Sequence, residues 1–287
     1  MKNIFCNSFS SGLRLALFFL SAVVVPAIAG EPETMTPERG VLILSGGGPP
    51  PEEVWGEFTK QVSNSKLTRE SGFRISIIPT ADEKFHLDES SHLIQLWRTR
   101  SVNEISLIHA HTREVAESRE LIERIRKSSG VWINGGTQSI LSERYAGTAV
   151  ERELVQLLNR GGVVGGTSAG TAIMTKVMIE RSLKENPDEP VPGVGFNLLP
   201  GFVADQHFLA RKRTPRLEKM LLRNPKLYGL GVDERTAAVL FIEGNKVSAY
   251  SVGKSEAMFY EPFERANSLK AIPLPKGYEP VLLATLE

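Results

Sequence analysis

Cysteine is almost absent from this chain, and that shortage excludes several kinds of chemistry. The only cysteine among the 287 residues is Cys6. It precedes an N-terminal apolar stretch that we expect to be cleaved off during export, as argued from its sequence below. The remaining chain would then have neither a disulfide nor a thiol nucleophile, and a lipoprotein anchor is disfavoured.

An excess of charge of either sign is also lacking. The chain has 34 basic and 33 acidic residues, for a formal net charge of +1. It has no strongly basic patch, and losing Lys2 and Arg14 with the N-terminal stretch would leave it near neutrality. The composition therefore gives no support for nucleic-acid binding.

Nucleotide-binding glycine motifs are missing too. The chain has no Gly-x-x-x-x-Gly-Lys-Ser/Thr loop and no Gly-x-Gly-x-x-Gly after its first apolar strand. The nearest candidate, Gly46 to Pro51, has the wrong spacing, and its prolines remove backbone donors. We therefore expect no nucleotide or other cofactor.

One long apolar run is present, at the N-terminus. Lys2 and Arg14 precede apolar residues from Leu15 to Val25, and the small residues Ala27-Ile28-Ala29 stand before Gly30. This is the order of a secretory signal peptide. An uncleaved anchor is the alternative, although the run extends to about fifteen residues where a bilayer needs about twenty. We expect a signal peptide over residues 1–29 and a secreted or periplasmic protein without a stable membrane anchor.

The remaining chain is expected to have a short extension, residues 30–40, and one α/β domain, residues 41–287. Continuous apolar runs alternate with segments of helical spacing, which indicates a parallel sheet covered on both faces. The predicted strands lie within 41–48, 73–81, 104–112, 130–138 and 162–170. The predicted helices lie within 51–62, 89–100, 114–127 and 147–160. A turn at Glu243-Gly244-Asn245 predicts an antiparallel hairpin as a C-terminal extension of this doubly wound sheet.

A possible nucleophile follows the fifth predicted strand. Gly166-Thr167-Ser168-Ala169-Gly170 matches Gly-x-Ser-x-Gly, in which small neighbours permit a sharp turn that exposes a serine hydroxyl. A glycine-rich turn that packs a helix on a sheet is the alternative. Two further glycine-rich segments, at 45–48 and 134–138, follow other strands, and we expect all three to line one crevice.

A serine nucleophile needs a base and an orienting carboxylate. Of the histidines outside the leader, His86 and His92 lie in a polar stretch that favours solvent. His109 and His111 would share one face of a strand, but no third ligand stands at metal-site spacing, so we predict structural roles and no metal. His207 ends an apolar segment, and we expect the sheet to place this residue at the same edge as the three glycine-rich segments. The acid is Asp233 or Glu234, between two apolar runs.

Four segments of the chain together resemble the motifs of cyanophycinases and related peptidases of family S51. They are GGTQ at 135–138, GGTSAG at 165–170, DQHF at 205–208 and GVDERTA at 231–237. The resemblance runs from about Val41 to Tyr250. It implies a flavodoxin-like sheet related to class I glutamine amidotransferases, and a homodimer.

The resemblance also implies site roles. Ser168 would be the nucleophile, His207 the base and Glu234 the orienting acid, with Asp233 the less favoured neighbour. Backbone N–H groups of Gly136 and Ala169 would form the oxyanion hole.

Residues that contact substrate are implied as well. They are Gln138, Asp205, Arg211 and Arg216, whose guanidinium groups suit substrate carboxylates. For Lys212 and Arg213 we favour a solvated basic face instead.

The chain departs from the family pattern at Thr137, Thr171 and Arg235, and in the charged segment 179–193. None of these changes removes a member of the triad. We expect an exported serine peptidase that releases β-Asp-Arg dipeptides from cyanophycin through an acyl-enzyme. The alternatives are a dipeptidase for α-aspartyl or isoaspartyl peptides and a non-catalytic binding relative.

Overall fold

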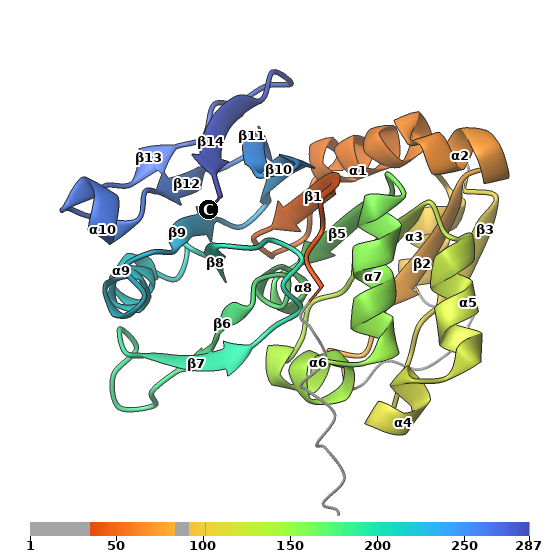
Figure 1. Cartoon of the computed structure of the whole chain (residues 1–287), viewed down its shortest axis with the longest axis horizontal. Helices are drawn as coiled ribbons and strands as arrows, with labels where there is room; N and C mark the ends of the chain where they lie inside the picture. Colours follow the sequence, from red (N-terminus) through yellow and green to blue (C-terminus); the bar gives the residue numbers. More distant parts are fainter. Residues whose placement is uncertain (1–34, 84–91, 101, 287) are drawn as a thin grey trace, which may run out of the picture. The chain divides into compact units, whose positions relative to one another are not determined.

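The central element is an eight-stranded sheet with the strand order β14-β11-β10-β1-β5-β4-β2-β3 (Figure 1). The computed structural model describes residues 35–83, 92–100 and 102–286. The parallel strands are β1 (Arg39–Ser45), β2 (Arg74–Ile78), β3 (Glu104–Leu107), β4 (Gly130–Ile133) and β5 (Val163–Thr167). All five predicted strands are therefore confirmed, together with the α/β fold class.

The antiparallel extension of this sheet is also confirmed. Strand β10 (Thr236–Glu243) pairs with β1, and β11 (Lys246–Gly253) returns beside it. The turn between them contains Gly244, whose φ of +60° is easy for glycine and costly for a branched side chain. Strand β14 (Val281–Thr285) forms the outer edge.

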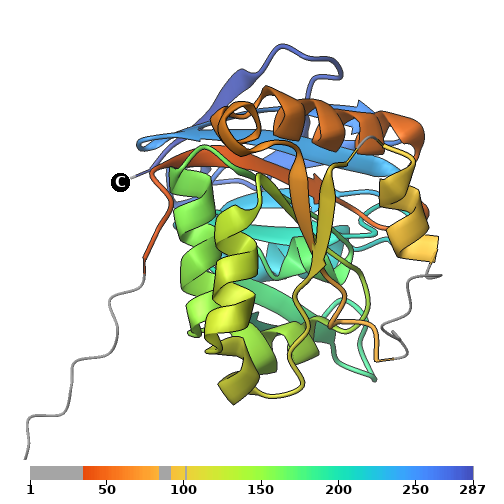
Figure 2. The ribbon, with the colours of Figure 1, turned by 90° about the vertical axis from the view of Figure 1, so that its right-hand side faces the viewer.

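Helices cover both faces of the sheet, as buried parallel strands require. In Figure 2, α1 (Glu52–Asn64) lies on one side, and α5 (Arg119–Lys127) and α7 (Ala149–Asn159) lie on the other. The shorter helices of the large sheet are α2 (Lys66–Ser71), α3 (His92–Arg98), α4 (Arg113–Ala116), α6 (Gln138–Tyr145) and α8 (Ala169–Ala172).

The single helix predicted over 114–127 is wrong, because the segment forms two helices, α4 and α5. Ser118 begins the second one, where its side chain accepts a hydrogen bond from the N–H of Leu121. A serine that caps a helix N-terminus in this way satisfies a backbone donor and starts a new helix.

A second sheet, with the order β13-β12-β9-β8, was not predicted. Its strands are β8 (Phe202–Gln206), β9 (Tyr228–Val232), β12 (Ala257–Tyr260) and β13 (Ile272–Pro273). Strands β8 and β9 are parallel, with α9 (Thr214–Arg223) between them in the chain. A short helix, α10 (Phe263–Ala266), follows β12. A separate antiparallel pair, β6 (Val177–Ser182) and β7 (Pro190–Val194), forms a hairpin from most of the charged segment.

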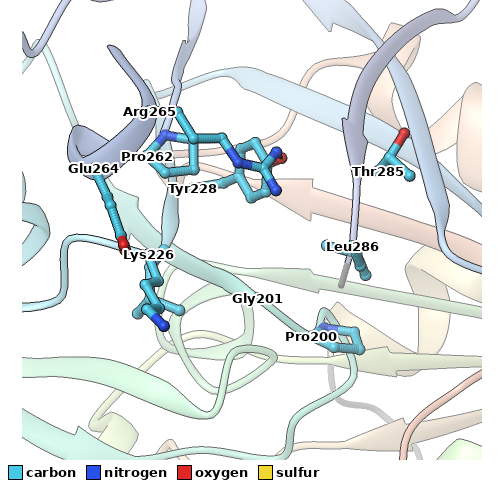
Figure 3. A pocket seen from close by; sticks show the side chains of 10 residues that line it. Pro200, Gly201, Lys226, Tyr228, Pro262, Glu264, Arg265, Thr285 and Leu286 are labelled. Carbon is cyan, nitrogen blue, oxygen red and sulfur yellow. Dashed lines mark hydrogen bonds between the residues drawn. The ribbon is translucent and has the colours of Figure 1, made fainter. Parts of the chain in front are cut away.

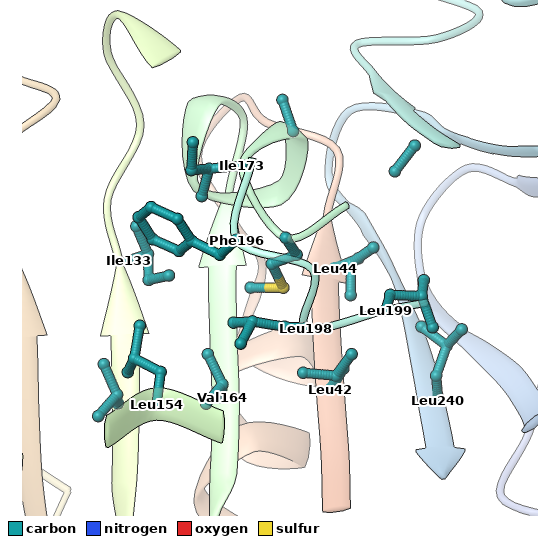
Figure 4. Close-up of a cluster of buried hydrophobic side chains, with 14 of the residues drawn as sticks. Leu42, Leu44, Ile133, Leu154, Val164, Ile173, Phe196, Leu198, Leu199 and Leu240 are labelled. Carbon is teal, nitrogen blue, oxygen red and sulfur yellow. The ribbon is translucent and has the colours of Figure 1, made fainter. Parts of the chain in front are cut away.

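One apolar core joins the two sheets. Leu42, Leu44 and Val164 of the large sheet (Figure 4) belong to the same buried cluster as Phe202 and Leu230 of the second sheet. The opposite face of the large sheet buries a second cluster with Trp55, Trp97 and Trp132. The described residues form one compact unit.

The predicted signal peptide and its cleavage point before Gly30 lie outside the described residues. Within the part of the chain that is described, no helix has the length and apolar character needed to span a membrane.

Candidate active site

Ser168 occupies a sharp turn between β5 and α8. Its φ of 54° and ψ of −111° are unusual for a residue with a side chain. The turn depends on its glycines, because a Cβ on Gly170 would lie 2.1 Å from the carbonyl oxygen of Ile133. The N–H of Ser168 donates to the carbonyl of Ser45 over 3.0 Å. This geometry is that of a nucleophile elbow, in which strain at one residue exposes its side chain.

His207 and Glu234 follow the carboxyl ends of β8 and β9 in the second sheet. Oγ of Ser168 lies 2.9 Å from Nε2 of His207, and Nδ1 of His207 lies 2.5 Å from Oε1 of Glu234. The structure thus brings together the three residues predicted as a triad. A carboxylate at Nδ1 favours the tautomer that leaves Nε2 free to accept the serine proton.

The glycines after β1 form the surface against which the imidazole packs. A Cβ on Gly47 would lie 2.3 Å from Cε1 of His207, and one on Gly48 would lie 3.3 Å from Oε2 of Glu234. The N–H of His207 donates to the carbonyl of Gly46 over 2.6 Å. Sequence reasoning rejected this segment as a cofactor loop and placed it in the same crevice as the other two glycine-rich segments, without a contact to the histidine. Three glycines at a strand end were the available signal for a close backbone approach.

The electrostatic surroundings of His207 favour its neutral form. Burial lowers the pKa of this histidine below its usual value, and the nearby charges of Arg211 and Arg213 lower it further, while the hydrogen bond to Glu234 opposes them. A neutral imidazole at neutral pH is the form that accepts a proton from serine.

Two backbone amides beside Ser168 are candidates for an oxyanion hole. Ala169 begins α8 directly after the serine, and a Cβ on Gly135 would lie 3.3 Å from Cβ of Ser168. Gly136 follows with a φ of 140°. Among the described residues, neither Ala169 nor Gly136 donates its N–H to a protein acceptor. Amides without a partner beside a nucleophile are available for a developing oxyanion.

Gln138, predicted to contact substrate, binds the β6–β7 hairpin. Its Nε2 donates to the carbonyls of Ile179 and Glu180 over 3.1 Å and 2.6 Å. The half-buried amide thus connects the start of α6, just beyond Gly136, to strand β6.

Asp205 and Arg216, the next predicted pair, form a buried ion pair. Nε and Nη2 of Arg216 donate to the two carboxylate oxygens of Asp205 over 2.7 Å and 2.5 Å, and Nη1 donates to Oγ of Ser182. The exposed fractions of the two residues are only 1% and 3%. Their polar groups are therefore directed at each other and at the hairpin.

The remaining basic residues of this segment differ in exposure. Arg211 and Lys212 are exposed, and the backbone N–H of Arg211 donates to the carbonyl of His207. The predicted solvated position of Arg213 is wrong, because its side chain is only 15% exposed and donates to the main-chain and side-chain oxygens of Gln206. Burial lowers the pKa of Arg213 to about 10, so it remains charged at neutral pH.

The predicted placement of His109 and His111 on a strand is also wrong. Strand β3 ends at Leu107, and both residues follow it with their ring centroids 4.4 Å apart. Nδ1 of His109 lies 3.0 Å from Oγ1 of Thr80, which also contacts the hydroxyl of Tyr145. Within the described residues, no group of three or more His, Cys, Asp or Glu side chains is arranged to hold a metal ion. His86 lies outside the described residues.

The departures from the family pattern leave the triad geometry in place. Thr171 is buried, and its hydroxyl donates to the carbonyls of Ser45 and Gly166, which ties α8 to β1 and β5. Thr137 precedes α6 and is exposed, as is Arg235, which has a φ of 58°.

A cavity of about 380 Å³ lies away from these residues (Figure 3). Gly201 and Tyr228, at the amino ends of β8 and β9, line it together with Arg265 and Leu286. His207 and Glu234 follow the carboxyl ends of the same two strands. Each strand has five residues, so the cavity at its amino end lies roughly 17 Å from the site residues at its carboxyl end. This cavity is therefore not part of the candidate active site.

The chain is similar in sequence to curated cyanophycinases. The chain is 29% identical over 213 residues to a cyanophycinase of Synechococcus elongatus, and the match covers 72% of this chain and 64% of the relative. It is 30% identical to a cyanophycinase of Trichormus variabilis, over 66% of this chain and 64% of the relative. The chain thus spans a little under two thirds of the length of these relatives.

A solved peptidase from an acI-B1 Actinobacterium has a similar fold, with a TM-score of 0.63. It is 19% identical and covers 86% of this chain and 98% of its own. Residues 41–250, which hold the nucleophile elbow, His207 and Glu234, match the model of peptidase family S51, and the chain therefore belongs to that family.

Proposed function

We propose that this protein is a serine peptidase of cyanophycinase type that hydrolyses β-aspartyl-arginine polymer to β-Asp-Arg dipeptides. The observation that carries the proposal is the continuous contact from Ser168 through His207 to Glu234. Membership of family S51 and identity of about 30% to curated cyanophycinases support the substrate class.

The geometry suits acyl transfer in two steps. As Oγ of Ser168 bonds to the scissile carbonyl carbon, Nε2 of His207 takes the hydroxyl proton. The carbon–nitrogen bond then breaks, and the same proton passes to the leaving amine. A water molecule attacks the resulting ester, gives its proton to His207, and the released serine oxygen takes that proton back. Amides of Ala169 and Gly136 would stabilise the oxyanion in both steps.

Arg211 is the residue that we propose for contact with a substrate carboxylate. It is exposed, it lies on the turn that carries His207, and no described side chain forms an ion pair or hydrogen bond with its guanidinium. A guanidinium presents paired donors that match a carboxylate. Asp205 and Arg216 are bound to each other, so we propose that they support the turn that carries His207 and Arg211 and do not contact substrate.

We also propose export, because the first 29 residues have the order of a signal peptide. A cleaved chain whose N-terminal residue is Gly30, identified by mass spectrometry after expression in a bacterium with a secretory pathway, would support this. An intact leader on a membrane-bound protein would contradict it.

The central experiment measures soluble dipeptide released from cyanophycin by the purified protein and by its Ser168→Ala variant. We expect β-Asp-Arg from the wild type and none from the variant, which should keep the wild-type fold. Equal release by both would contradict the nucleophile.

A dipeptidase for aspartyl or isoaspartyl peptides is the competing function. If the wild type cleaves such dipeptides and leaves the polymer intact, the serine chemistry stands and the polymer substrate is wrong. Inertness of the wild type toward a fluorophosphonate probe would instead favour a non-catalytic relative.

A further inference from the structure

Asp233, the residue before Glu234, has a buried and fully bonded carboxylate. Oδ1 accepts the backbone N–H groups of Leu209 and Ala210 over 3.0 Å and 2.8 Å, and Oδ2 accepts the hydroxyl of Ser255 over 2.6 Å. Only 7% of the residue is exposed. Its oxygens are therefore directed at main chain and at Ser255, whereas those of Glu234 are directed at the imidazole.

The two amides that Asp233 binds belong to the turn that carries His207. The N–H of Arg211 donates to the carbonyl of His207, and that of Arg213 donates to the carbonyl of Phe208. The first amides of such a turn have no internal partner. A carboxylate that accepts them closes the turn as an N-cap does, here from a segment more than twenty residues later in the chain.

Asp233 is itself held from other directions. Its N–H donates to the carbonyl of Glu256 over 3.0 Å, and the N–H of Ser255 donates to Oγ1 of Thr236 over 2.6 Å. A Cβ on Gly46 would lie 2.2 Å from the carbonyl oxygen of Asp233, so the glycine segment packs directly on it. The carboxylate therefore has a fixed position from which to hold the turn.

We propose that Asp233 is a positioning residue for His207, and that Ser255 orients its carboxylate. The neighbouring residues Asp233 and Glu234 then position His207 in two ways. Glu234 binds Nδ1 of the imidazole, and Asp233 binds the main chain of the turn that contains His207. This inference rests on the proposed role of His207 as the base.

The ionisation of Asp233 agrees with this role. Burial raises the pKa of its carboxyl, but the hydrogen bonds from Ser255 and from the backbone outweigh burial and leave the pKa below its usual value. The group is therefore a carboxylate at neutral pH and accepts hydrogen bonds with both oxygens.

The test compares Asp233→Ala, Asp233→Asn and Ser255→Ala by the rate at which a fluorophosphonate probe labels the folded protein. Asparagine retains an oxygen that accepts both turn amides, whereas alanine retains none. We expect labelling to slow roughly 100-fold in Asp233→Ala, as for a displaced catalytic group. We expect a loss of less than about tenfold in Asp233→Asn and of about tenfold in Ser255→Ala. Asp188→Ala, at an exposed aspartate between β6 and β7, is the matched control and should label at the wild-type rate.

The pH profile separates positioning from a structural role. In Asp233→Ala the loosened turn should expose His207 to water, and the lowering of its pKa by burial would be lost. The acid limb of labelling, which is the decline of the labelling rate toward acid pH, should therefore move to higher pH. Glu234, Arg211 and Arg213 are the charged groups that act on this histidine, and the substitution leaves all three in place. A purely structural role would lower the melting temperature and leave this limb unchanged.

Three results would overturn the proposal. They are wild-type labelling by folded Asp233→Ala, equal losses in Asp233→Asn and Asp233→Ala, and an unchanged acid limb. If Asp233→Ala fails to fold, Ser255→Ala decides, and a wild-type labelling rate in it would count against the proposal. Failure of the proposed function is recognised separately, because neither the wild type nor any variant would then label at Ser168.

Discussion

Ser168 and His207 both adopt left-handed backbone conformations, with φ of 54° and 49°. Such conformations cost about 1–3 kcal/mol each when the residue is not glycine, and they persist only where the surroundings impose them. Here the surroundings are glycines: Gly170 lets α8 approach β4, and Gly47 lets the β1 loop approach the imidazole. The catalytic geometry thus depends on residues without side chains as much as on the triad.

Gly47→Ala should remove most of the activity and cost about 1–3 kcal/mol of stability, because its φ of +108° favours glycine. A methyl group at this position would lie 2.3 Å from Cε1 of His207, so the imidazole must move away from Ser168. We expect the rate of fluorophosphonate labelling to fall roughly 100-fold.

Gly161→Ala is the matched control for this change. Gly161 also has a positive φ, of +84°, but a Cβ there would meet nothing within 4 Å. It should label at the wild-type rate. If Gly47→Ala matches that control, the loop does not fix the imidazole.

Activity should decline toward acid pH through the pKa of His207, because only the neutral imidazole accepts the serine proton. That pKa lies below its usual value, so the decline should begin at a lower pH than for an exposed histidine. Arg211→Ala removes one of the positive charges that lower this pKa, and should move the acid limb of labelling to higher pH.

Arg211→Lys keeps the positive charge and should leave the acid limb of labelling at the same pH as in the wild type. Glu234→Gln removes a hydrogen bond that raises the pKa of His207, so its limb should move to lower pH, along with a loss of rate. An uncharged fluorophosphonate probe is the appropriate reagent, since it avoids the proposed contact between Arg211 and substrate. Identical limbs in Arg211→Ala and the wild type would contradict the electrostatic account.

At the scale of elements, the β6–β7 hairpin is the part that sequence reasoning described least well. It lies in a charged segment without a clear apolar period, and its partners are distant in the chain. Gln138 and Ser142 of α6 hold it on one side. On the other side Arg216 and Arg223 of α9 hold it. Short strands with such contacts are set by tertiary partners, which a local pattern does not reveal.

The Asp205–Arg216 pair should contribute to the stability of this region. Arg216→Ala would leave the buried carboxylate of Asp205 without its main partner, and breaking a buried pair typically costs about 3–5 kcal/mol. We expect a loss of that size in the free energy of unfolding, measured by urea denaturation.

Two further variants control for this loss. Arg211→Ala, at an exposed arginine of the preceding turn, should change stability by less than about 0.5 kcal/mol. The double variant Asp205→Ala/Arg216→Ala should lose less than Arg216→Ala, since it removes the buried carboxylate and leaves only Arg213, which still bonds to Gln206, without its ion pair with Asp205. A single variant as stable as the wild type would show that the ion pair is dispensable.

At the scale of the whole molecule, the triad spans two sheets: Ser168 follows a strand of the large sheet, and His207 and Glu234 follow strands of the second. The parallel strands could be predicted because each is an apolar run that ends in glycine or polar residues. The second sheet could not, because β9 pairs with β8 and β12 across long separations and its residues look like a continuation of β10. The choice between Asp233 and Glu234 likewise required three-dimensional contacts or family resemblance.

The two sheets should unfold together, because Leu42 and Val164 share one buried cluster with Phe202 and Leu230. The described tryptophans, Trp55, Trp97 and Trp132, all pack on the far face of the large sheet. Tryptophan fluorescence therefore reports on that sheet, whereas probe labelling requires both. We expect the two signals to change at the same urea concentration. Loss of labelling at a lower concentration would show that the second sheet opens independently.

The hairpin also has a practical consequence. Gln138, Ser142 and Arg223 bind main-chain oxygens of the hairpin, which any sequence retains. Arg216, Lys219 and Arg223 bind the side chains of Ser182 and Glu189, so these two positions of the hairpin need to be kept. The rest of this hairpin can therefore be replaced by other sequences of similar length that keep the same contacts. Sequence libraries can be built at its other positions while Ser168, His207 and Glu234 stay unchanged.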